Sequence, residues 1–151
     1  MVDFSKLSRP KSKSAPTDPI EIFKKTPNTG GAPNDLWKGQ ADALAAWDRA
    51  RTDNDNLIIL NTGAGKSVVG LMVAQSLINE GVENVLFACS TIDLVEQTAR
   101  EAEKRGLSYT TRTSGSSSND GFETGKSFCI YGLFSRAARS SASLSIAILY
   151  P

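Results

Sequence analysis

The sequence predicts an α/β fold in which helices flank a parallel β-sheet. From about residue 36 onward, short apolar runs alternate with longer segments that have helical periodicity. The apolar runs are rich in isoleucine, valine and phenylalanine, which is typical of strands buried on both faces. Strands that alternate with helices are joined by crossover connections, and such connections place neighbouring strands parallel to one another.

The composition narrows the class of protein. The chain has 151 residues, of which 40% are apolar and 22% charged, as expected for one globular domain with a core. A net charge of +1 offers no overall basic field for nucleic acid, and no apolar run is long enough for a membrane span. Histidine is absent, which excludes histidine-based catalytic triads. We expect an intracellular protein, cytoplasmic or nuclear, in which Cys89 and Cys129 are buried free thiols.

Residues 1–35 differ from the rest of the chain. They contain five of the six prolines, surrounded by serine, threonine and lysine. This composition predicts a mostly disordered arm, followed by a folded domain over residues 36–151. The basic residues of the arm either contact phosphates or only keep the chain in solution, and the second role is the more common one.

The first expected element of the domain is a helix in the stretch LWKGQADALAAWDRA. Trp37, Ala41, Leu44 and Trp47 recur at helical spacing and should form its apolar face. The run LIIL at 57–60 then reads as a buried parallel strand.

A second helix is expected over 65–79, where apolar residues cover nearly the whole circumference, as in a deeply buried helix. Downstream, strands are expected at 85–89, 107–111 and 127–134, a helix at 92–105 and a flexible loop at 113–121. On the helix at 92–105, the spacing of Glu96 and Arg100, and of Glu101 and Arg105, predicts ion pairs on the solvent side.

The turn between the LIIL strand and the buried helix has the residues of a phosphate-binding loop. Gly63 and Gly65 permit positive φ and a close approach of the backbone, so that successive N–H groups can face an anion. The positive end of the following helix points at the same place. Lys66 would reach the β- and γ-phosphates of a nucleotide, and the Ser67 hydroxyl would bind Mg²⁺. The alternative is a glycine-rich turn that binds nothing.

This loop and two other segments resemble superfamily 2 helicases and translocases, the group that includes DEAD/DEAH-box and type III restriction-like proteins. Asn61-Thr62-Gly63-Ala64-Gly65-Lys66-Ser67 is similar to motif I of that group, with Leu60 where the general phosphate-loop pattern has glycine. Gln40 resembles the upstream glutamine that recognises adenine. Ser90-Thr91-Ile92-Asp93-Leu94-Val95-Glu96-Gln97 resembles motif Ia, which contacts the nucleic-acid backbone.

The resemblance covers residues 36–107 and implies part of a RecA-like P-loop NTPase domain. It implies ATP and Mg²⁺ as cofactors, and DNA or RNA as a partner. The implied nucleotide-binding residues are Gln40, Thr62, Gly63, Ala64, Gly65, Lys66 and Ser67, the last also holding Mg²⁺. The implied nucleic-acid contacts are Ser90, Thr91 and Gln97. Without the resemblance, Gln40 is an ordinary exposed helix residue and Thr91 an ordinary helix N-cap.

The acids that cleave ATP in this superfamily have no counterpart in the sequence. The family carries an Asp-Glu pair at the end of a later strand, which positions Mg²⁺ and activates the attacking water. Glu123 is the last acidic residue here, and the strand-like tail LSIAILYP ends in Tyr150-Pro151. We therefore assign no catalytic residue, and expect a truncated or frame-shifted relative that lacks the second helicase domain.

Three functions remain compatible with the sequence. The first is an ATP-binding fragment of a nucleic-acid-dependent ATPase with little or no activity of its own. The second is a non-catalytic module that binds a nucleotide or a nucleic acid. The third is a small P-loop kinase or transferase, against which the chain shows no lid-like arginine cluster and no acceptor site.

Overall fold

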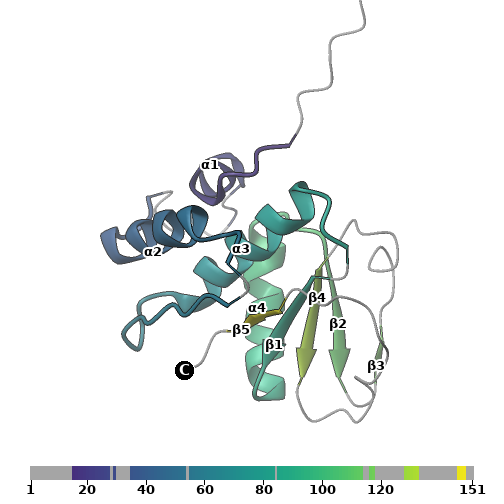
Figure 1. Cartoon of the computed structure of the whole chain (residues 1–151). Coiled ribbons are helices and arrows are strands. Elements are labelled where there is room, and N and C mark those ends of the chain that lie inside the picture. The colour runs from purple at the N-terminus through teal and green to yellow at the C-terminus, as the bar shows by residue number, and fades with distance from the viewer. Residues whose placement is uncertain are drawn as a thin grey trace, which may run out of the picture.

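A computed structural model describes residues 15–27, 29, 35–53, 55–83, 85–113, 116–117, 128–132 and 146–148. The described helices are α1 (Pro19–Lys25), α2 (Lys38–Arg49), α3 (Lys66–Asn79) and α4 (Ile92–Lys104). The described strands are β1 (Leu86–Cys89), β2 (Tyr109–Thr113), β3 (Ser116–Ser117), β4 (Phe128–Gly132) and β5 (Ile146–Ile148). Figure 1 shows the sheet on one side of the molecule, with α1, α2 and α3 gathered on the other.

These strands form one sheet in the order β3-β2-β4-β1-β5. Strand β1 pairs in parallel with β4 and with β5, and β2 pairs in parallel with β4, whereas the short β3 is antiparallel to β2. The predicted α/β class with a parallel sheet is therefore confirmed. The apolar part of the tail, expected to be a strand, forms β5 beside β1.

Helix α3 lies at the centre of the core. Its residues Val69, Leu71 and Met72 are fully buried, together with Phe128 and Ile130 of the equally buried β4. Both α3 and α4 contact β1 and β4, and they contact each other. The helix that was predicted to be apolar all round is thus packed on several sides, which explains why its sequence has no polar face.

The expected strand at 57–60 is absent. These four residues have no regular secondary structure, and Leu57 and Ile59 are 80% and 83% exposed. Ile58 and Leu60 are half-buried and pack against the core, so the segment shows the alternation of a strand that has one covered face. A strand also needs a neighbour for its backbone hydrogen bonds, and none of the described strands pairs with this segment.

The expected disordered arm is wrong for residues 19–25, which form α1. Asp18 caps the helix by accepting a hydrogen bond of 2.8 Å from the Ile20 N–H, and Pro19 occupies the first helical position. Ile22 and Phe23 are buried and belong to the core cluster. Proline is favoured at the first position of a helix as well as in linkers, so its presence did not exclude a helix here. Ile22 and Phe23 pack this helix on the core. The rest of the expected arm lies largely outside the described residues.

Candidate nucleotide-binding site

The loop from Asn61 to Gly65 has the backbone shape that the sequence predicts. Gly63 and Gly65 adopt φ values of 81° and 75°, in the left-handed region that glycine enters without steric cost. The Ala64 N–H closes a turn by donating to the Asn61 carbonyl at 3.1 Å. Gly65 then acts as the N-cap of α3, because its carbonyl accepts from the Val68 and Val69 N–H groups at 3.0 and 3.4 Å.

Lys66 and Ser67 are the first two residues of α3. Helix geometry leaves their N–H groups without an acceptor inside the helix, and the helix dipole adds a partial positive charge at this end. Within the described part of the chain, Lys66 forms no ion pair with a carboxylate. A methyl group added at Gly63 would meet no atom within 4 Å, so the space beside the loop is open.

Gln40 joins the loop to the start of α2. Its Oε1 accepts a hydrogen bond of 3.1 Å from the Trp37 N–H, and its Nε2 donates one of 2.9 Å to the Ala64 carbonyl. The side chain is buried, and a Cβ added at Gly65 would overlap its amide nitrogen. Gln40 is therefore not an ordinary exposed helix residue. Its side chain links the backbone of Trp37 to the phosphate loop by two hydrogen bonds. Its recognition of adenine stays a prediction.

Trp37 departs from its expected position. Helical spacing predicts that it lies on the apolar face of α2 with Leu44 and Trp47, both of which are buried. Instead, Trp37 is 62% exposed and is the N-cap residue of the helix. An N-cap residue has extended backbone angles, here φ −61° and ψ 148°, so its side chain does not follow the helical face that the spacing assumes.

The segment that resembles motif Ia begins at the carboxyl end of β1. Ser90, Thr91 and Gln97 are all exposed. The Thr91 hydroxyl caps α4 by accepting a hydrogen bond of 3.2 Å from the Leu94 N–H. Figure 1 shows that α4 begins at the lower end of the sheet, where β1 ends, and that α3 lies beside the sheet.

One of the two ion pairs expected on the solvent side of α4 is largely buried. Glu96 and Arg100 are exposed and 3.6 Å apart, as predicted. Arg105, by contrast, is buried; it pairs with Glu101 at 2.9 Å, and its guanidinium lies 4.6 Å from the centre of the Phe23 ring. Phe23 belongs to α1, so this is a long-range contact that a local pattern does not reveal.

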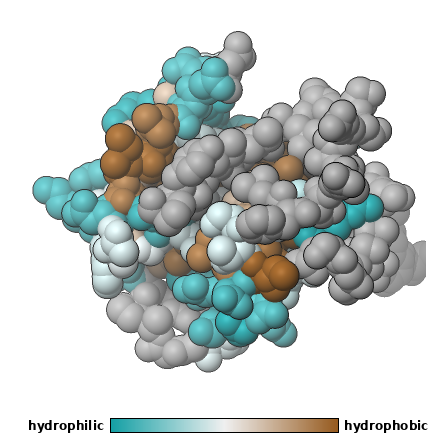
Figure 2. All heavy atoms as spheres, turned by 90° about the horizontal axis from the view of Figure 1, so that it is seen from below, coloured by the Kyte–Doolittle hydropathy of each residue, from teal (hydrophilic) through white to brown (hydrophobic). Residues whose placement is uncertain are grey.

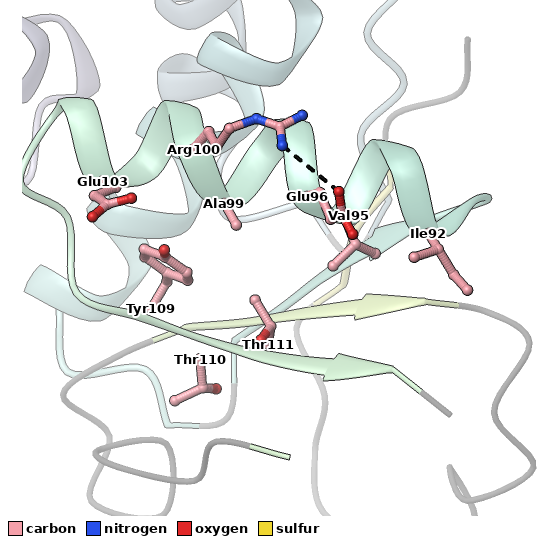
Figure 3. A pocket seen from close by; sticks show the side chains of 9 residues that line it. All are labelled: Ile92, Val95, Glu96, Ala99, Arg100, Glu103, Tyr109, Thr110 and Thr111. Atoms are coloured by element: carbon pink, nitrogen blue, oxygen red, sulfur yellow. Dashed lines mark ion pairs between the residues drawn. The ribbon is translucent and has the colours of Figure 1, made fainter. Parts of the chain in front are cut away.

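A groove of about 560 Å³ lies away from the phosphate loop, between α4 and β2. Figure 3 shows Glu96, Glu103 and Arg100 along its helical side and Tyr109 and Thr111 along the strand. Two carboxylates against one guanidinium make a poor surface for a phosphate backbone. We therefore assign no nucleic acid to the groove.

No group of three or more histidine, cysteine, aspartate or glutamate side chains that could hold a metal occurs among the described residues. The Ser67 hydroxyl stays the predicted protein ligand of a Mg²⁺ ion at the loop. No helix in the described part of the chain is long and apolar enough to cross a membrane.

A parallel α/β sheet, a loop with two left-handed glycines and a buried helix that begins at Lys66 together define part of a RecA-like domain. The model of the family described as type III restriction enzyme, res subunit, matches residues 34–146, which is well over half of the chain. The chain belongs to this family, a group of helicase-like ATPases of superfamily 2. No curated protein and no solved structure gave a significant match. The predicted resemblance is confirmed at the level of the superfamily.

Proposed function

We propose that this chain binds Mg²⁺ and a nucleoside triphosphate, ATP in the first instance, at the loop from Asn61 to Ser67. The triphosphate lies against the backbone of the loop, Lys66 neutralises its outer phosphates, and Ser67 holds the metal. The folded unit that binds it extends from α1 to β5, and thus includes residues from the segment expected to be an arm.

The single observation that carries this proposal is the backbone of the loop. Gly63 and Gly65 both have positive φ, and the loop leads directly into the N-terminus of a buried helix. This arrangement exposes several N–H donors and one helix dipole to the same point, which favours an anion with several charged oxygens. Lys66 and Ser67 stand at the start of that helix, where each can reach such an anion.

The test is thermal unfolding with and without Mg-ATP. A ligand that binds only the folded state raises the midpoint by mass action, so we expect a rise of several degrees at saturating nucleotide. Lys66→Ala should abolish the rise while leaving the midpoint of the free protein nearly unchanged. Lys24→Ala removes an exposed lysine from α1 and serves as the matched control. A rise that survives in Lys66→Ala would contradict the proposal.

We expect this chain to bind ATP without hydrolysing it efficiently. The segment from Thr124 to Pro151 contains no aspartate or glutamate, so it offers no carboxylate to activate the attacking water. A purified preparation of this chain should therefore turn over ATP at or near the background rate. Robust ATPase activity that is lost in Lys66→Ala would show that another group supplies the base.

We further propose that Ser90, Thr91 and Gln97 contact the backbone of a nucleic acid. Their support is that they are exposed and lie directly after β1 and on α4. Thr91 and the first turn of α4 would supply hydrogen-bond donors to a phosphate. Single-stranded DNA and RNA should bind weakly and in a salt-dependent manner, and Gln97→Glu should weaken that binding. Equal binding by the wild-type chain and this variant would argue against the assignment.

A further inference from the structure

The groove between α4 and β2 has no part in the proposed nucleotide site, and none of its lining residues belongs to the phosphate loop. Its volume of about 560 Å³ is within the range of protein sites that hold ligands. Figure 3 shows Val95 and Ala99 of α4 facing Tyr109 and Thr111 of β2 across it. Ala99 and Thr111 are small, so the helix and the strand leave space between them. The hollow therefore results from the packing of two elements.

The two ends of the groove differ in chemistry. Ile92 lies at the end where α4 begins, and its side chain is 51% exposed. Figure 2 views the lower side of the molecule and shows brown apolar residues at the surface among teal hydrophilic ones. At the other end of the groove, Glu103 lies beside the Tyr109 ring (Figure 3). The groove thus offers an apolar contact at one end and a carboxylate next to an aromatic ring at the other.

The carboxylate of Glu103 is available to a cation. In the described part of the chain it forms no ion pair, whereas Glu96, also in the groove, pairs with Arg100 at 3.6 Å. Burial raises the pKa of Tyr109 and the negative charge of Glu103 raises it further, so the two side chains interact. A carboxylate beside an aromatic ring attracts ammonium and guanidinium groups, the first by charge and the second by its π-face.

The groove is long enough for a short stretch of extended chain. From Ile92 to Glu103, α4 rises about 16 Å, because a helix rises about 1.5 Å per residue. An extended chain advances about 3.3 Å per residue, so about five residues span this length. Strand β3 pairs with β2 at Arg112 and Thr113, and none of the described strands lies beside residues 109–111 on that edge. An added strand can therefore pair with β2 there.

We propose that this groove binds an extended segment of a partner protein, with an apolar side chain and, about four residues away, a lysine or arginine. The apolar side chain packs against Ile92, and the cation lies between the Glu103 carboxylate and the Tyr109 ring. Glu96 and Glu103 against Arg100 leave one net negative charge among the described lining residues, and a basic segment complements it. An acidic segment would bring like charges together.

The first experiment selects peptides from a display library of random heptapeptides on the full wild-type chain and on Glu103→Lys. Sequences enriched on the wild type should carry an apolar residue and a basic residue at the proposed spacing, and Glu103→Lys should not enrich them. The absence of an enriched motif on the wild type would overturn the proposal. So would a motif without a basic residue, or one that Glu103→Lys selects equally well.

The best selected peptide is then titrated against single variants by fluorescence anisotropy. Glu103→Gln should weaken binding roughly tenfold, because it removes the charge that the basic residue meets. Ile92→Ser should weaken it at the apolar end. Glu83→Gln removes an exposed carboxylate outside the groove and is the matched control, for which we expect no change. Equal affinity for the wild-type chain and Glu103→Gln would contradict the assignment.

Two further measurements separate the partner segment from other occupants. A synthetic peptide of residues 1–14, which contains four basic residues and one acidic one, is titrated alongside the selected peptide. Tighter binding of this peptide would place the chain's own N-terminal segment in the groove and overturn the partner assignment. Sedimentation of the wild-type chain should show a monomer; a dimer that Glu103→Lys abolishes would place a second copy there and overturn it as well. Glu103→Gln should keep the wild-type unfolding midpoint, since Glu103 is exposed.

Discussion

At the scale of single residues, Gly65 has the strictest steric requirement of the loop. It combines a φ of 75° with the close approach of the Gln40 amide, so neither its conformation nor its surroundings accept a side chain. Gly63 has a similar φ but open space beside it. Both glycines have a positive φ, but only Gly65 also makes room for a neighbouring protein group, whereas the proposed nucleotide would lie in the open space beside Gly63.

Gly65→Ala tests this distinction. The left-handed conformation costs an alanine about 1–2 kcal/mol, and the displaced Gln40 amide adds to that cost. We expect a loss of unfolding free energy of at least this size in urea titrations, together with loss of the Mg-ATP thermal shift. Gly39→Ala is the matched control, since Gly39 lies in α2 with no atom within 4 Å of an added Cβ. It should keep or slightly raise stability, because alanine favours a helix.

Gln40→Ala separates two roles of the glutamine. If Gln40 supports the loop, the substitution leaves the Ala64 carbonyl and the Trp37 N–H without their hydrogen-bond partner. This loss costs about 1 kcal/mol and loosens the loop. We expect the affinities for Mg-ATP and for Mg-tripolyphosphate, which has no base, to fall together, as measured by calorimetry. If only the affinity for Mg-ATP falls, adenine recognition by Gln40 is the better account.

At the scale of elements, α1 joins the ends of other helices. Arg51, after α2, donates to the Thr17 carbonyl and to the Ser76 hydroxyl of α3, and it also pairs with Glu80. Phe23 lies under the guanidinium of Arg105 at the end of α4. These contacts make the segment from Thr17 to Lys25 part of the folded unit, although its composition resembles that of a linker.

Phe23→Ala measures how much this element contributes. Removing a buried phenylalanine typically costs about 3–5 kcal/mol, and the loss of the ring under Arg105 adds to it. We expect a large fall in the urea midpoint, whereas Lys24→Ala at the neighbouring exposed position should change little. A loss below about 1 kcal/mol for Phe23→Ala would mean that α1 does not pack on the core in solution.

At the scale of the whole molecule, the two cysteines report on the integrity of the core. Burial raises the pKa of both thiols, against the smaller lowering effects of a hydrogen bond between Cys89 and Thr98 and of one between Cys129 and Thr110. Cys89 lies on β1 and Cys129 on β4, so the folded sheet favours the protonated form of both thiols.

This burial predicts a loss of stability in alkali. Unfolded thiols ionise with a pKa of about 8.5, whereas the folded pKa values are higher, so the folded state binds more protons in between. The contribution of the two buried thiols to the free energy of unfolding should therefore be fully present below about pH 8. It should be lost as the pH rises through the folded pKa values. Urea unfolding between pH 7 and pH 9.5 measures the fall, and Cys89→Ala with Cys129→Ala should reduce its slope. An equal slope in that double variant would assign the fall to other groups.

Local patterns accounted for most of the helices, the later strands and the loop. These features involve neighbouring residues only, so the sequence alone can predict them. They are the helical periodicity at 66–79 and 92–104, the apolar runs of β1 and β4, and the glycines of the loop. They also carry the resemblance to superfamily 2 that the family match confirms.

Contacts between distant segments decided the rest. Arg105 lies against the Phe23 ring of α1, and Gln40 donates to the loop carbonyl of Ala64 because the loop lies beside α2. The residues at 57–60 form no strand because none of the described strands pairs with them. A sequence by itself determines which conformation a segment prefers and which motif it carries. Only the tertiary structure determines what each side chain meets, because burial and hydrogen bonding depend on neighbours that are far away in the chain.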